Sequence, residues 1–262
     1  MWLLLALSGC KAVAPAPEDL DGLLAWMWRS YDQGDDADLA EAIRNLDEAI
    51  GAEAMDGVSD GTLSDLLPED AARVGIEDRD PAGAQGLYLV RDYPCTLAQL
   101  EPILYALPQA EQYPDVYDSY VRAYTSDLDD YLARNTPALS WEVDYAATLL
   151  GDSYQAHIEG GLRYLGALEP AETPWGPVLI SRVYLPQAAQ FDAGSGKSMN
   201  QDYQLEIFYE REPGRIVHAY GMWREADYGS GLSLEDGAVQ RILLNNLSDW
   251  DDQTAALCAE GG

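Results

Sequence analysis

Basic residues are scarce in this sequence. Its 262 residues include 15 Lys and Arg against 46 Asp and Glu, which gives a formal net charge of −31 at pH 7. Nucleic acids and anionic lipid surfaces are polyanions that proteins contact through positively charged faces. The composition therefore argues against nucleic acid, and against an anionic surface, as the main partner.

Long apolar runs and zinc-site motifs are also missing. No stretch approaches the roughly 18 to 20 apolar residues that a membrane-spanning helix needs. The chain has only two His, and neither a His-Glu-x-x-His nor a Cys-x-x-Cys motif occurs. We therefore predict no metal, no cofactor and no catalytic residue. Apolar residues still make up 47% of the chain, which is enough for a folded core.

The N-terminus is a short apolar run that ends at a cysteine. Leu7-Ser8-Gly9-Cys10 resembles the lipobox of bacterial lipoproteins, in which small residues admit the signal peptidase and the cysteine sulfur receives a lipid. The resemblance implies that residues 1–9 are a signal peptide and that Cys10 is lipidated. The apolar run is short for such a signal, and no Lys or Arg precedes it. The alternative is an apolar chain end with an ordinary thiol.

The same resemblance predicts a place in the cell. Residues 10–17 are rich in Ala and Pro and would form a tether between the lipid and the folded part. Lys11 stands where Asp would favour retention in the inner membrane. We therefore expect a lipid-anchored protein of the bacterial outer membrane, facing the periplasm or the exterior.

Two further cysteines, Cys95 and Cys258, lie far apart in the sequence. In an exported protein a pair of thiols usually ends as a disulfide, because the compartment is oxidising. We predict this bridge. The alternative is two buried free thiols, which behave as small apolar side chains.

Residues 18–85 form an acidic helical segment followed by a loop. Apolar side chains recur at steps of three and four over 20–31 and over 39–50, which predicts two amphipathic helices. Residues 51–85 contain turn signals and little periodicity, so we expect a loop-rich connection. Residues 18–80 hold 19 Asp and Glu against four Arg, which is about half of the net charge.

Residues 86–262 change pattern and are predicted to form an α+β domain. A short strand covers 87–90, and Thr96 with Gln99 fits a capping box at the start of a helix. A stripe of Tyr and Leu predicts a second helix that starts near Tyr117 and ends near Asn135. Alternating segments then predict a meander of five strands over 140–150, 154–166, 176–186, 202–210 and 215–226.

The chain ends with a second long amphipathic pattern. Apolar residues from Val239 to Leu257 trace one helical face, and Ser233 is the expected N-cap. The order of helices, antiparallel meander and long C-terminal helix resembles the START-like helix-grip fold. The resemblance is topological, covers about residues 86–258 and implies a curved sheet wrapped around the last helix. A closed lipocalin-like barrel, which needs about eight strands, is the alternative.

The START-like resemblance also implies a hydrophobic small molecule held between the sheet and the last helix. The 17 Tyr and seven Trp, against two Phe, suit a cavity whose walls are apolar with polar tips. The competing interpretation is that these rings simply fill the core.

Residues 193–198, Ala-Gly-Ser-Gly-Lys-Ser, end like a phosphate-binding loop. Phe191 stands where that motif requires its first Gly, and the segment lies between two predicted strands. We therefore interpret it as a turn.

His157 shares a strand face with Gln155, Glu159 and Arg163, which would allow acid–base chemistry, but a polar surface is the preferred interpretation. The acidic clusters at 35–38, 127–130 and 249–252 do not match the calcium-loop spacing. They are expected to form a solvated surface.

The sequence thus favours a non-catalytic, lipid-anchored cell-envelope protein with a hydrophobic small molecule as its candidate ligand. Cys10 would carry the lipid anchor, and the Cys95–Cys258 disulfide would crosslink the C-terminal segment to the middle of the chain. The alternative is an interaction or scaffold lipoprotein that docks a basic protein partner through the acidic helices. An enzyme that uses His157 or His218 ranks third.

Overall fold

The computed structural model describes residues 15–32, 34–52, 59–166, 176–229 and 231–261. The predicted signal peptide, the lipobox and Cys10 lie outside these described residues. Within the described ranges, no helix is long and apolar enough to cross a bilayer.

An antiparallel sheet forms the centre of the described chain. Its strands follow the order β1-β2-β9-β8-β6-β5-β4-β3, and the short β7 pairs with β5. β1 and β3 stand at opposite ends of this order, so the described sheet is open and the closed-barrel alternative is wrong. The strands are Ser59–Leu63 (β1), Gln85–Pro94 (β2), Ser119–Tyr124 (β3), Ala138–Leu149 (β4), Asp152–Leu165 (β5), Val178–Tyr184 (β6), Gln190–Phe191 (β7), Ser198–Glu212 (β8) and Arg215–Asp227 (β9).

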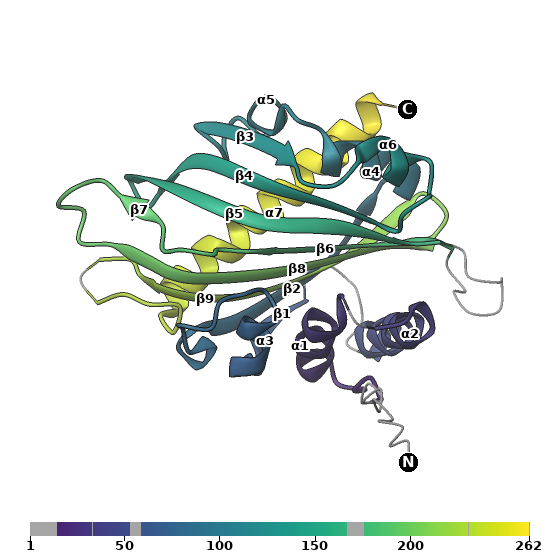
Figure 1. The fold of residues 1–262 in the computed structure, drawn as a ribbon, viewed down its shortest axis with the longest axis horizontal. Coiled ribbons are helices and arrows are strands. Elements are labelled where there is room, and N and C mark those ends of the chain that lie inside the picture. The colour runs from purple at the N-terminus through teal and green to yellow at the C-terminus, as the bar shows by residue number, and fades with distance from the viewer. Residues whose placement is uncertain (1–14, 33, 53–58, 167–175, 230, 262) are drawn as a thin grey trace, which may run out of the picture.

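Helices lie on both faces of the sheet (Figure 1). The α+β class, with N-terminal helices, an antiparallel sheet and a long C-terminal helix, is therefore confirmed. The helices are Leu20–Ser30 (α1), Asp36–Ala52 (α2), Pro68–Ala72 (α3), Leu97–Tyr105 (α4), Gln109–Gln112 (α5), Leu128–Leu132 (α6) and Gly237–Glu260 (α7), with a 3-10 turn at Pro81–Gly83.

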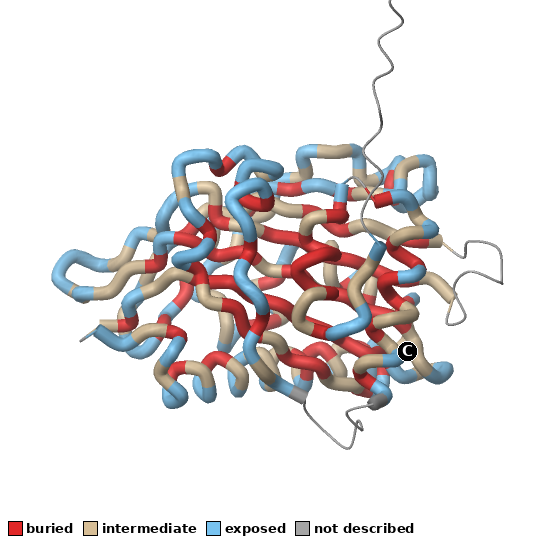
Figure 2. Tube along the Cα trace, turned by 90° about the horizontal axis from the view of Figure 1, so that it is seen from below, coloured by how far each residue is buried: buried red, intermediate tan, exposed pale blue. Residues whose placement is uncertain are grey.

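Alternation along β8 assigns its side chains to two different layers, because neighbouring residues of a strand point to opposite faces. Leu205, Ile207 and Tyr209 join the core cluster formed with α1 and α2. Gln204 and Glu206 face the other side, toward α7. Figure 2 shows buried residues concentrated in the interior of the molecule and exposed residues toward its periphery.

α1 packs its apolar face on the outer side of the sheet. Asp19 caps the helix by accepting a hydrogen bond from the backbone N–H of Gly22 at 2.7 Å. The fully buried Trp28 meets the rings of Tyr203 and Trp223 with centroid distances of 5.5 and 6.2 Å. The helix therefore contributes to the main core.

Ion pairs attach the end of α1 and the start of α2 to the sheet. Arg163 of β5 contacts Asp36 at 2.8 Å, and Arg182 of β6 contacts Asp32 at 2.6 Å. Both guanidinium groups are largely buried, while the two carboxylates are exposed. Part of the acidic charge of residues 18–85 is thus neutralised within the chain.

α7 lies along the opposite face and crosses the sheet diagonally (Figure 1). Val239 and Leu243 of the helix pack in one cluster with Leu89 of β2. Near the other end of α7, Cys258 forms a disulfide with Cys95, which directly follows β2. The helix is therefore held at both ends against the same strand.

The start of α4 follows the predicted capping box. The Gln99 N–H donates to Thr96 Oγ1 at 3.2 Å, and the Thr96 N–H donates to Gln99 Oε1 at 2.9 Å. Pro102 lies within the helix. The prediction of a capped helix here is confirmed.

The long helix expected from Tyr117 to Asn135 is wrong. Residues 119–124 form edge strand β3, and the short helix α6 follows after its N-cap Asp127. Tyr120 and Tyr124 lie four residues apart, and this spacing fits the same face of either a helix or a strand. Pairing with β4 decides for the strand, because it satisfies the backbone of residues 119–124.

Three smaller expectations are also corrected. α7 begins at Gly237 with Asp236 as its N-cap, because Ser233 instead accepts a hydrogen bond from the backbone N–H of Glu235 within a preceding turn. Residues 51–85 contain β1 and α3 in addition to loops. The described sheet has nine strands, since β1, β3 and β7 add to those expected.

Candidate ligand cavity

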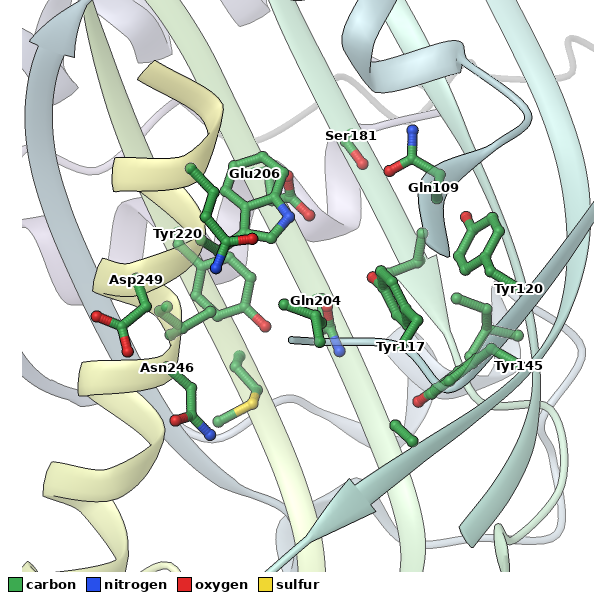
Figure 3. A pocket seen from close by; sticks show the side chains of 18 of the residues that line it. Gln109, Tyr117, Tyr120, Tyr145, Ser181, Gln204, Glu206, Tyr220, Asn246 and Asp249 are labelled. Carbon is green, nitrogen blue, oxygen red and sulfur yellow. The ribbon is translucent and has the colours of Figure 1, made fainter. Parts of the chain in front are cut away.

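A cavity of about 720 Å³ separates the inner face of the sheet from α7. Figure 3 shows labelled side chains from α7, from the central strands and from the β3–β4 side converging on this space. Its aromatic and aliphatic lining includes Tyr117, Tyr120, Trp141, Tyr145, Ala147, Leu149, Tyr154, Ile158, Leu162, Val183, Tyr220, Met222, Leu243, Leu247 and Trp250. Its polar lining includes Gln109, Arg122, Ser181, Gln204, Glu206, His218, Arg224, Asn246 and Asp249.

Strand alternation produces the apolar wall. Trp141, Tyr145 and Ala147 of β4 face the cavity, whereas Glu142 and Asp144 point outward and are exposed. The alternation predicted for this strand is confirmed. Ala147 supplies one of the smallest side chains of the wall and leaves space in front of it.

Tyrosines supply much of the lining. Burial raises the pKa of Tyr117, Tyr145 and Tyr220 well above the ordinary value, so these phenols remain neutral at physiological pH. The ring of Tyr154 lies edge-on to that of Tyr145, with centroids 5.8 Å apart, and the two hydroxyls are 3.5 Å apart. The wall therefore combines apolar ring faces with neutral hydroxyl groups.

Three ionisable side chains meet at the cavity, where Glu206 and His218 are part of the lining and Asp251 is fully buried. Nδ1 of His218, on β9, lies 2.7 Å from Oδ1 of Asp251, on α7, and both side chains are buried. Nε2 of His218 lies 3.9 Å from Oε2 of Glu206, on β8. The imidazole stacks on Phe208 with a centroid distance of 4.3 Å.

Burial and charge shift the pKa values of this group. Burial raises the pKa of Glu206, and the nearby Asp251 adds to that increase. Burial alone would lower the pKa of His218, but the charge and hydrogen bond of Asp251, together with Glu206, raise it above the ordinary value. The carboxyl group and the imidazole therefore both hold protons more strongly than in water.

A separate buried ion pair lies on the inner face of the sheet. Arg224 donates from Nε and Nη2 to the two carboxylate oxygens of Asp202, at 2.9 and 2.8 Å, and both residues are buried. Gln204 donates to the same carboxylate at 2.6 Å. This guanidinium is thus neutralised locally.

The two histidines occupy different environments. His157 lies on the outer face of β5, where Nδ1 is 2.9 Å from Oδ1 of the exposed Asp144. On the same face, Arg163 binds Asp36 and Glu159 accepts a hydrogen bond from Tyr184. The structure therefore brings this group together as surface contacts, away from the cavity, while His218 lines it.

The remaining candidate motifs have structural roles. Lys197, of the loop that resembles a phosphate-binding motif, donates to the carbonyl oxygens of Leu149 and Leu150 at 3.0 and 2.8 Å. Asp127 caps α6 through the N–H of Asp130 at 3.0 Å. Among the described residues, no group of three or more His, Cys, Asp or Glu is arranged to hold a metal ion.

One motif escaped the sequence interpretation. Residues 57–61 read Gly-Val-Ser-Asp-Gly and match the Gly-x-Ser-x-Gly pattern. That pattern needs a strand-to-helix turn to expose its serine. Ser59 instead opens the edge strand β1, and residues 57 and 58 lie outside the described part, so nothing supports a nucleophile here.

Glu206, Asp202 and Arg224 are site residues that the sequence interpretation missed. Gln204 and Glu206 alternate with Leu205 and Ile207, a pattern typical of a strand with one solvent-exposed face. The signal that could have identified them is the amphipathic C-terminal helix, because a helix that covers this face encloses its polar side chains.

Comparisons with known proteins give structural likenesses only. No family model matches the sequence, and no curated protein matches it. Human STARD10 has a TM-score of 0.45 at 9% identity, over 79% of this chain and 71% of that chain. A START superfamily protein from Mycobacterium smegmatis has a TM-score of 0.44 at 11% identity, over 67% and 97%. Human StAR-related lipid transfer protein 5 has a TM-score of 0.41 at 7% identity, over 86% and 97%.

Proposed function

We propose that this protein binds a hydrophobic small molecule in the cavity between the sheet and α7. The observation that carries the proposal is the cavity itself, about 720 Å³ with aromatic and aliphatic walls and a few polar groups that face inward. Ligand pockets typically measure about 300 to 1,000 Å³ and have this kind of lining. The volume therefore suits a molecule of lipid or drug size.

Burial of an alkyl chain supplies the driving force. Each buried CH₂ group contributes about 0.8 kcal/mol, so a chain of about ten carbons gains roughly 8 kcal/mol. Loss of translational and rotational freedom opposes binding by roughly 4 to 15 kcal/mol. Short apolar molecules should consequently bind weakly, and affinity should rise with chain length until the cavity is full.

The first test is a search for a bound molecule. Native mass spectrometry of the Cys10→Ser protein, purified gently from bacterial periplasm, should show an added mass of lipid size. Titration with the neutral apolar dye N-phenyl-1-naphthylamine then measures the cavity directly, since the dye brightens in apolar surroundings. A dye signal that does not saturate, together with an empty protein, would contradict the proposal.

Matched variants assign the dye to the cavity. Ala147→Trp places an indole in the open space and should abolish saturable dye binding. Ala123→Trp makes the same change at an exposed, outward-facing position of β3 and should leave dye binding as in the wild type. Equal binding by both variants would place the dye elsewhere.

We further propose that the domain is anchored to the bacterial outer membrane through a lipid on Cys10. The lipobox resemblance of residues 7–10 supports this proposal, and so does the Cys95–Cys258 disulfide, because disulfides persist in oxidising compartments. The wild type should partition into detergent and carry the mass of a diacylglycerol, whereas Cys10→Ser should stay in the aqueous phase. A full-length chain that retains Met1 and remains aqueous would overturn the anchor.

A further inference from the structure

Asp251, Glu206 and His218, counted by themselves, carry an unbalanced charge. Asp251 and Glu206 flank His218, at 2.7 Å and 3.9 Å respectively. With both carboxylates ionised and the imidazole protonated, the group retains one negative charge. A buried charge without a partner is costly, so either a proton or a bound cation should balance it.

The cations nearest to this group have other partners. Arg122 of β3 donates to the Leu104 carbonyl and to the Tyr120 hydroxyl, both at 2.7 Å. Arg91 of β2 pairs with Asp252 at 2.9 Å. Within the described chain, neither forms an ion pair with Glu206, although the partners of Arg122 are neutral oxygens and its positive charge opposes the rise in the pKa of this carboxyl group. Five phenols also lie near the group, namely Tyr93, Tyr113, Tyr117, Tyr120 and Tyr220, and the exposed carboxylates of Asp249 and Asp252 line the same cavity from α7.

His218 and Glu206 both present polar atoms without a partner, and when the imidazole is protonated the carboxylate is the group that can accept a hydrogen bond from a ligand. Nε2 of the buried His218 has no hydrogen-bond partner among the described residues. The Glu206 carboxylate likewise receives no hydrogen bond from any of them, and its side chain is 18% exposed, toward the cavity that it lines. Figure 3 labels Glu206 and Tyr220 among the side chains that line the cavity.

We propose that the ligand of this cavity is an amphiphile with a primary ammonium head group, and that Glu206 binds that head. The inference rests on the proposed function, and it adds the chemical class of the ligand. An ammonium supplies a positive charge in direct contact with Glu206 and N–H donors for its carboxylate. The aromatic rings of Tyr220 and Trp250 line the same space and favour a cation, while the apolar wall takes the chain.

The proposal implies that a proton and the ammonium compete for one carboxylate. Burial raises the pKa of Glu206, so the empty cavity takes up a proton over the acid range. An alkylammonium keeps its own proton to about pH 10, as a Lys side chain does. Ligand binding should therefore release a proton from Glu206 wherever the empty protein holds one, and affinity should rise as pH increases through the pKa of this carboxyl group.

The test compares dodecylamine, dodecan-1-ol and dodecanoic acid as competitors of N-phenyl-1-naphthylamine on the Cys10→Ser protein at pH 7. The amine should displace the dye at concentrations about tenfold or more below those of the alcohol, as expected for a hydrogen bond to a charged group. The acid should be the weakest, because it adds a second negative charge. Calorimetry of amine binding in buffers of different ionisation enthalpy, repeated at several pH values, should show proton release that declines as pH rises.

Matched variants separate the site from general attraction to an acidic protein. Glu206→Gln should keep dye and alcohol binding and lose both the amine preference and the proton release. Glu206→Met, of similar length, gives a second variant with the same expectation. Glu142→Gln removes the same charge from the exposed face of β4 and should behave as the wild type.

Each outcome decides between the two proposals. Equal displacement by amine and alcohol in the wild type would overturn the ammonium head group while the cavity remains a binding site. An amine preference that survives in both Glu206 variants would overturn the role of this carboxylate. If the dye does not bind and no competitor shows calorimetric binding, both the head-group inference and the proposed function fail.

Discussion

Removal of the disulfide should destabilise the protein by several kcal/mol. Cys95 and Cys258 are 163 residues apart, and each is almost fully buried. In the chain-entropy model a crosslink that closes a loop of this length restricts the unfolded chain by about 5 kcal/mol. Replacement of both thiols by Ala keeps the site apolar, so the change acts mainly on the unfolded state.

The assay is urea unfolding monitored by tryptophan fluorescence. The reference is the Cys10→Ser protein, and the variant adds Cys95→Ala and Cys258→Ala, so that only the bridge differs. We expect the free energy of unfolding to fall by about 3 to 5 kcal/mol, with a larger m value because the unfolded chain exposes more surface.

Two results would refute the reasoning about the bridge. A loss of less than about 1 kcal/mol would mean that the crosslink does not restrict the unfolded chain as the loop length implies. Two free thiols in the non-reduced reference protein, detected by mass after alkylation, would mean that the bridge does not form.

Three further predictions concern the core and its buried charges. Trp28→Ala should lower the free energy of unfolding by about 3 to 5 kcal/mol, since α1 would lose its fully buried ring against the sheet. A loss near zero in urea unfolding would mean that α1 does not contribute to the core. Asp251→Ala should cost about 3 kcal/mol at pH 6, because His218 loses its partner. The pKa of His218 is raised in the folded state, so the stability that this pair contributes is complete below the unfolded pKa of about 6.5 and is lost as pH rises through the folded pKa. The difference in the free energy of unfolding between the wild type and Asp251→Ala should therefore be smaller at pH 9 than at pH 6. Asp202→Ala should destabilise more than a double variant in which Asp202 and Arg224 both become apolar, and the reverse order would refute the interpretation of this buried pair.

The acidic helices bear on the scaffold alternative. Asp32 and Asp36 are already paired with arginines of the sheet, and α1 contributes to the main core. Docking of a basic partner stays a prediction, to be checked by pull-down at increasing salt. Because exposed charges are screened, such an interaction should weaken steeply with ionic strength.

The sequence by itself determined those elements whose defining pattern involves only residues close together in the chain. Thr96 and Gln99 form their capping box through contacts three residues apart, so the start of α4 follows from the sequence. The alternation from Trp141 to Leu149 identifies β4 and its inner face for the same reason. The α+β class also follows, because helical and alternating periods occupy separate stretches of the chain.

Tertiary structure alone decided the features that depend on distant partners. Residues 119–124 fit a helical or an extended period, and only pairing with β4 settles the matter. Glu206 has the pattern of a surface residue, and it is enclosed because α7, about forty residues later, covers that face. No sequence pattern predicts that Glu206, His218 and Asp251 lie together. They come from β8, β9 and α7, and they meet only when the helix packs on the sheet.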